Sequence, residues 1–109
     1  MEAVDLDHLG RYTGGDRTVN GDILGLFDAQ IMGLVAELSA TRCDPSRWRE
    51  IAHTIKGAAG GVGAFALGEA AARAEHTDPA DTVDARTAIE ALKSEACSVH
   101  GFIQAYLGL

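Results

Sequence analysis

A long run of apolar residues at helical spacing near the C-terminus constrains the fold most. Its members recur every three or four residues: Ala85, Ile89, Leu92, Ala96, Val99, Ile103 and Tyr106. This spacing keeps one face of an α-helix apolar for about six turns. A lone helix cannot bury such a face, so we expect a helix from about Asp81 or Val83 to Tyr106, packed against other helices.

The rest of the sequence predicts four more helices. They are expected at residues 5–12, from 18 or 20 to 40, from 45 to a break near 63, and at 66–76. The second has an apolar stripe of Leu24, Phe27, Ile31, Leu34 and Leu38. No alternating β pattern occurs and the loops are short, which predicts an all-α fold, an antiparallel up-and-down four-helix bundle with a short N-terminal helix. At 109 residues we expect one domain, 1–109.

Several residues refine these helices. Asp5 and Asp44 are expected as N-caps, with Pro45 in the first helical position. Trp48 is expected in the core or packed at the helix start. Gly25 and Gly33 weaken the second helix, and they are tolerable if a neighbouring helix approaches closely there. The Ala-rich fourth helix predicts tight helix–helix contact.

Charge and composition exclude several classes of protein. The formal net charge is −7 and no basic tract occurs, which disfavours binding to nucleic acid. No apolar run approaches the ~20 residues of a membrane span, and the first residues do not resemble a signal peptide. Cys43 and Cys97 lack a disulfide or metal pattern. We therefore expect free thiols in the cytoplasm and no contact with a membrane.

The third helix carries the candidate site. Its buried stripe is expected to contain Ile51, Ile55, Ala59 and Val62, so His53, two residues from both isoleucines, points to solvent. The residues that share this outer face are Arg49, Lys56, Gly57 and Gly60.

Two glycines on an exposed helical face are unusual, since each costs about 0.8–1.0 kcal/mol relative to Ala. Bare backbone beside His53 would let a second protein reach a nucleophilic imidazole. Lys56, one turn along, could reach a phosphate. Residues 42–56 contain four basic and two acidic side chains, a locally positive segment that favours an acidic partner.

Residues 52–64, Ala-His-Thr-Ile-Lys-Gly-Ala-Ala-Gly-Gly-Val-Gly-Ala, resemble the signature of histidine-containing phosphotransfer (HPt) domains. The resemblance implies a phosphoryl carrier in a multistep two-component phosphorelay, with phosphohistidine formed at His53, by resemblance at Nε2. Lys56 would stabilise the phosphate, and Gly57, Gly60 and Arg49 would serve access and docking. The partners would be response-regulator receiver domains and a hybrid histidine kinase. The receiver would bring Mg²⁺, and this chain would need no cofactor or metal of its own.

Two alternatives remain open. The chain could be an HPt-like docking module for a response regulator that performs no chemistry. It could also be a kinase dimerisation domain, although such domains carry Glu after the histidine and an Arg-Thr-Pro run, which His53-Thr54-Ile55 lacks. We expect a carrier without kinase activity. We also expect a monomer, because the predicted bundle buries its apolar stripes within one chain. The other histidines, His8, His76 and His100, are expected as surface or cap residues.

Overall fold

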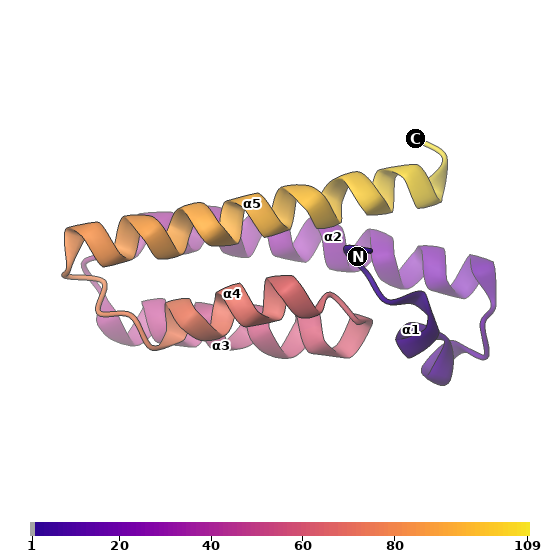
Figure 1. The fold of residues 1–109 in the computed structure, drawn as a ribbon, viewed down its shortest axis with the longest axis horizontal. Helices are drawn as coiled ribbons and strands as arrows, with labels where there is room; N and C mark the ends of the chain where they lie inside the picture. The colour runs from indigo at the N-terminus through magenta and orange to yellow at the C-terminus, as the bar shows by residue number, and fades with distance from the viewer. Residues whose placement is uncertain (1) are drawn as a thin grey trace.

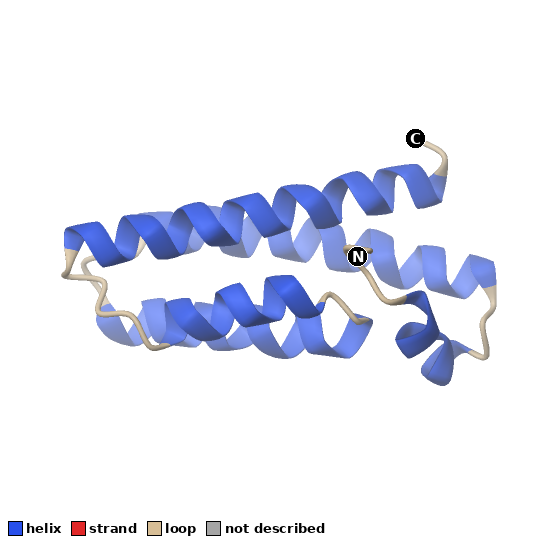
Figure 2. Cartoon of the chain, in the orientation of Figure 1, coloured by secondary structure: helices blue, strands red, loops and turns tan. Residues whose placement is uncertain are grey.

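The computed structural model describes residues 2–109 and is all-helical over that range, which confirms the predicted all-α class. No strand occurs among these residues (Figure 2). The helices are α1 (Leu6–Thr13), α2 (Arg17–Ala40), α3 (Pro45–Val62), α4 (Phe65–Glu75) and α5 (Thr82–Leu107).

Aspartates begin four of the helices. Asp5, Asp44 and Asp81 cap α1, α3 and α5 through side-chain oxygens that accept backbone N–H bonds. Asp16 does the same for α2 and accepts from Val19 N at 3.0 Å. The predicted start of α2, at about Thr18 or Asn20, was therefore one to three residues late, because Asp16 caps the helix instead of extending the turn before it. The expected start of α4 was one residue late and the expected end of α5 one residue early.

The four long helices lie side by side, and successive ones run in opposite directions (Figure 1). α2 packs on α3 and α5, and α4 packs on the same two helices. The short α1 packs against α2 and α3. The body is elongated, with extents of 43 × 24 × 22 Å. Its α3–α4 and α2–α5 pairs form opposite sides.

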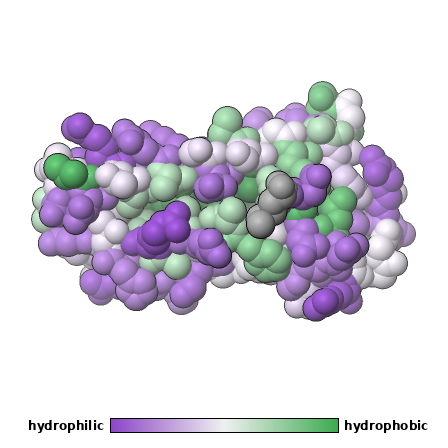
Figure 3. All heavy atoms as spheres, in the orientation of Figure 1, coloured by the Kyte–Doolittle hydropathy of each residue, from purple (hydrophilic) through white to green (hydrophobic). Residues whose placement is uncertain are grey.

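The core runs along the centre of this body. In the space-filling view, hydrophobic side chains gather along the middle of the face where α4 and α5 meet, between hydrophilic edges (Figure 3). Trp48 is buried, and its indole Nε1 donates to Ala74 O at 2.7 Å, which confirms its core placement and ties α3 to α4. On α2, Val35 is fully buried whereas Leu34, predicted for the stripe, is half-buried against the core.

Two glycine predictions have different outcomes. The expected break near Gly63 is confirmed: α3 ends there with φ 88°, and an added Cβ would lie 2.7 Å from Asp5 O. The condition under which Gly25 and Gly33 would be tolerable, close approach of a neighbouring helix, is not met among the described residues. A Cβ at either position would meet nothing within 4 Å, because both residues face away from the contacts of α2 with α3 and α5.

By length and composition, α2 could cross a membrane. Its buried residues include Leu24, Phe27 and Ile31, which lie in the core that the other helices share. A core helix passes the same test, so this property is weak evidence for a membrane span.

Candidate functional site

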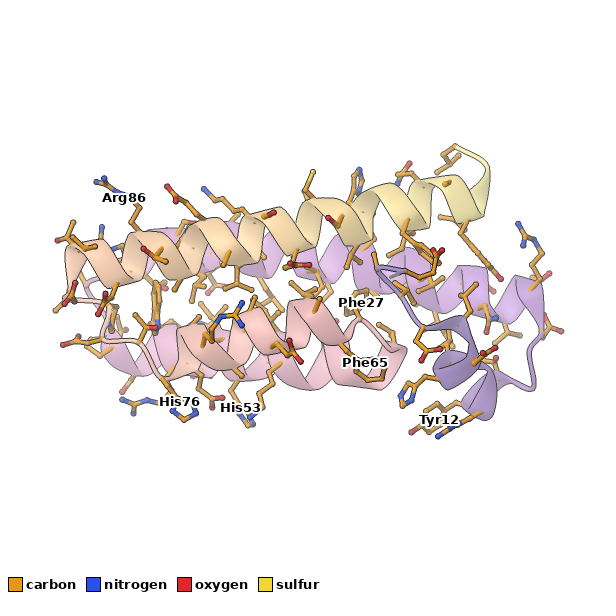
Figure 4. All side chains as sticks on the ribbon, in the orientation of Figure 1. Tyr12, Phe27, His53, Phe65, His76 and Arg86 are labelled. Atoms are coloured by element: carbon orange, nitrogen blue, oxygen red, sulfur yellow. The ribbon has the colours of Figure 1, made fainter. Side chains whose placement is uncertain are left out.

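α3 presents His53 to solvent, as the sequence predicts. Ile51, Ala52 and Ile55 are buried, whereas 71% of the His53 side chain is exposed. The side chain points away from the helical body (Figure 4). The register of α3 is set at its start, where Asp44 accepts from Arg47 N, and along its length by the buried stripe.

A residue that the sequence analysis missed, Glu75, holds the imidazole. Its Oε2 lies 2.9 Å from His53 Nδ1 and its Oε1 lies 3.6 Å from Lys56 Nζ. An ionised carboxylate only accepts hydrogen bonds, so in the neutral imidazole Nδ1 carries the hydrogen and Nε2 keeps its lone pair. The exposed nitrogen of the ring is thereby the nucleophilic one.

The electrostatics favour an ionised Glu75. Only 15% of its side chain is exposed, and this burial acts to raise the pKa. The hydrogen bond and charge of His53, followed by those of Lys56, outweigh burial and hold the pKa of Glu75 below its ordinary value. The carboxylate therefore stays charged and able to accept from Nδ1 at neutral pH.

Tight packing of α4 on α3 positions Glu75. The Trp48–Ala74 hydrogen bond lies one residue before it. At Gly68 the helices are so close that an added Cβ would lie 3.7 Å from the Ala59 Cβ and 3.8 Å from Lys56 O. The predicted tight contact of the Ala-rich helix is confirmed, and it brings a residue far along the chain onto the face of His53.

The backbone beside His53 is open. An added Cβ at Gly57, Gly60 or Gly61 would meet nothing within 4 Å. No contact within the described chain requires these glycines, unlike Gly63, where an added Cβ would clash with Asp5 O. Their absent side chains leave room for another molecule next to the imidazole.

The predicted basic segment is only partly free. Arg47 donates to Glu37 and to Glu50 Oε1, the latter at 2.7 Å, and both carboxylates raise its pKa. Lys56 faces Glu75. Arg49 is exposed and, with Glu75 and Trp48, lines a hollow of about 320 Å³ at the start of α3. The local positive charge is therefore smaller than the sequence count, because carboxylates from α2 and α4 enter the same region.

The other histidines divide into two groups. His76 is exposed and caps α4, as predicted. His8 is half-buried, so the prediction of a surface or cap residue was wrong for it, whereas 43% of the His100 side chain is exposed, in agreement with a surface residue. His8 packs edge-on against the rings of Tyr12 and Phe65. His100 Nδ1 lies 2.9 Å from Asp28 Oδ2 and joins α5 to α2.

Comparison with known proteins gives one match. A family model described as "Hpt domain" matches residues 22–98, more than two thirds of the chain. The matched range includes His53, Lys56 and Glu75. No curated protein and no solved structure matches the chain.

Proposed function

Because the chain belongs to the Hpt domain family, a family of phosphorelay histidine phosphotransfer, we propose that it carries a phosphoryl group on His53 between the aspartates of receiver domains in a multistep phosphorelay. The observation that carries this proposal is the imidazole geometry: Nδ1 bound by Glu75 and Nε2 exposed to solvent. A nucleophile held in one tautomer and open to a second protein suits a carrier.

The transfer uses the chain's own residues as follows. The Nε2 lone pair attacks the phosphorus of an aspartyl phosphate, an N–P bond forms, and the P–O bond to the aspartate breaks with departure of a carboxylate. The ring becomes positively charged while Nδ1 keeps its hydrogen, and the Glu75 carboxylate stabilises that charge. The reverse steps pass the group to the next aspartate.

Lys56 has the position for a phosphate contact. Its side chain is 47% exposed and its Nζ lies at ion-pair distance from Glu75, on the same face as His53. A flexible ammonium can turn from the carboxylate to a phosphoryl oxygen on Nε2. Its role is charge neutralisation, which phosphoryl transfer needs more than covalent chemistry from the protein.

The receiver docks over the open backbone. Gly57 and Gly60 provide the space, and exposed Arg49 provides a positive charge at the edge. Members of this family act with receivers and kinases generally. We propose that the receiver supplies Mg²⁺ and the acceptor aspartate, and that this chain has no cofactor and no kinase activity of its own.

The remaining features follow the same proposal. The four long helices form an antiparallel up-and-down bundle, supported by the packing of α2 and α4 each on α3 and α5. Residues 1–109 form one domain that works in the cytoplasm, consistent with two free cysteines.

Label transfer from a phosphorylated receiver tests the function. Wild-type protein and His76→Gln should take up label, whereas His53→Gln should not. His76, the residue that follows α4, is a matched control because it is exposed, as His53 is. Equal labelling of His53→Gln would overturn the proposal. Retained receiver binding by wild type with no label on it would favour the docking module instead.

A further inference from the structure

The side of the body formed by α2 and α5 is poor in charge. No Asp, Glu, Lys or Arg lies between Asp28 and Glu37 on α2, or after Glu95 to the end of the chain. Asp28 is turned toward α5 and paired with His100. On a protein with a net charge of −7, such a side is exceptional.

An apolar groove runs along this side. Its volume is about 400 Å³. α2 contributes Met32, Val35, Ala36 and Ser39 to it, and α5 contributes Lys93, Ala96, Cys97 and His100. Met32 is 49% exposed, although an unbranched apolar side chain of this size is usually buried. The groove therefore leaves apolar surface uncovered in a single chain.

Small residues flatten the surface around the groove. Gly25, Ala29 and Gly33 recur every fourth residue on α2, and Gly101 lies on the outer side of α5. An added Cβ at any of the three glycines would meet nothing within 4 Å. Each glycine costs about 0.8–1.0 kcal/mol in a helix, and packing within the chain does not explain them. Close approach by a helix of another molecule would.

Charge identifies the occupant. Two copies of this chain carry the same net charge of −7 and repel each other across any charged side. A partner of opposite charge would be recognised by acidic groups, which this side lacks along the groove. The groove is lined by apolar and small residues with no acidic residue and one basic residue, Lys93. On a strongly acidic protein, such a side is the surface across which like copies meet with the least repulsion.

We propose that the α2–α5 side is the contact surface of a homodimer, in which the groove of each copy receives apolar side chains of the other. The extents of 43 × 24 × 22 Å give one whole side on the order of 900–1,000 Å², so the ~800 Å² that each partner buries in a standard interface would cover most of that side. The contact is isologous, so Met32 lies at the rim of one groove and faces the other.

The dimer leaves the candidate site free. His53 lies on α3, which packs on α2 and α4 and does not contact α5 within residues 2–109. Each copy therefore keeps its own exposed imidazole on the side away from the contact. The monomer expected from the sequence rested on burial of the core stripes. The structure bears out that burial, and the dimer uses a different, outward set of residues.

Sedimentation and thiol labelling test the contact together. Wild-type protein should sediment at about twice the 11.4 kDa of one chain, with dissociation on dilution. The chain offers an internal control, since Cys97 lines the groove whereas Cys43 lies in the loop between α2 and α3, and both are exposed in one chain. Alkylation of Cys97 should slow about tenfold when about nine tenths of the chains are dimeric, while that of Cys43 stays constant.

Charge substitutions locate the surface. Ala36→Glu and Gly101→Glu place a carboxylate on it, and each should yield a monomer with rapid Cys97 alkylation. Thr87→Glu adds the same charge at an exposed site of α5 beside α4, and should remain dimeric. A wild-type monomer at all concentrations, or equal dissociation by Thr87→Glu, would overturn the proposal. Protection of Cys97 only after addition of a receiver or kinase would also overturn it and assign the side to that partner.

Discussion

The α3–α4 side and the α2–α5 side both expose helical glycines that no contact within the described chain requires, yet their surroundings differ. Gly57 and Gly60 lie beside a charged network of His53, Lys56 and Glu75. Gly25 and Gly33 lie on α2, the helix that lines one wall of an apolar groove with Met32, Val35, Ala36 and Ser39. The same sequence signal therefore indicates open surface in both places, and the chemistry around it is the basis for proposing phosphotransfer on one side and association on the other.

Among the substitutions that distinguish the two sides, Glu75→Gln is expected to have the largest effect on phosphoryl transfer. Glu75→Gln keeps the shape of the side chain but removes the charge that holds Nδ1 and stabilises the phosphorylated ring. Transfer from a phosphorylated receiver should fall about 10- to 100-fold, measured by label uptake at fixed receiver concentration. Glu69→Gln, an exposed carboxylate on the same helix, should change nothing. If Glu75→Gln took up label as fast as wild type, the proposed role of Glu75 in phosphoryl transfer would be contradicted.

A substitution at Trp48 tests whether the packing of α4 on α3 positions Glu75 beside His53. Trp48→Phe leaves Ala74 O buried without its donor and removes part of a fully buried ring. The free energy of unfolding should fall by about 2 kcal/mol in urea denaturation. Transfer should fall as well, because Glu75 follows Ala74. Loss of stability with unchanged transfer would show that Glu75 is positioned independently of this hydrogen bond.

Paired glycine substitutions compare the two sides directly. Gly57→Ala and Gly33→Ala should each raise the free energy of unfolding by about 1 kcal/mol, since both add Cβ to open space in a helix. Only Gly57→Ala should slow transfer, by about tenfold, because its methyl group enters the receiver contact. Equal transfer rates in the two variants would contradict the assignment of Gly57 to docking.

The smallest expected effect concerns how the free energy of unfolding of wild type and Glu75→Gln depends on pH in acid. The pKa of Glu75 is lowered in the folded protein, so its contribution to stability is complete above the ordinary carboxyl pKa and is lost as pH falls through the lowered value. The difference in unfolding free energy between wild type and Glu75→Gln should therefore shrink in acid. Denaturation series between pH 3 and pH 7 measure it. If this difference in unfolding free energy grew as the pH fell, the pKa of Glu75 would be raised in the folded protein and not lowered.

Much of the site was predictable because it depends on a single helix. The outward direction of His53 follows from its offset to Ile51 and Ile55, and the end of α3 follows from Gly63. Glu75 could not be found this way. In the sequence, Glu75 is recognisable only as the residue after Ala74, at the edge of the buried face of α4. That position does not indicate which residue Glu75 contacts.

The sequence by itself determined the helices, their aspartate caps and the face of α3 that carries His53. These depend on spacings of three or four residues, which a helix converts to geometry without reference to the rest of the chain. Tertiary structure alone decided the partners of charged residues, Glu75 with His53, Glu37 with Arg47 and Asp28 with His100, and it formed the apolar groove between α2 and α5. These pairs join different helices, so they depend on how the helices pack, which local spacing does not encode.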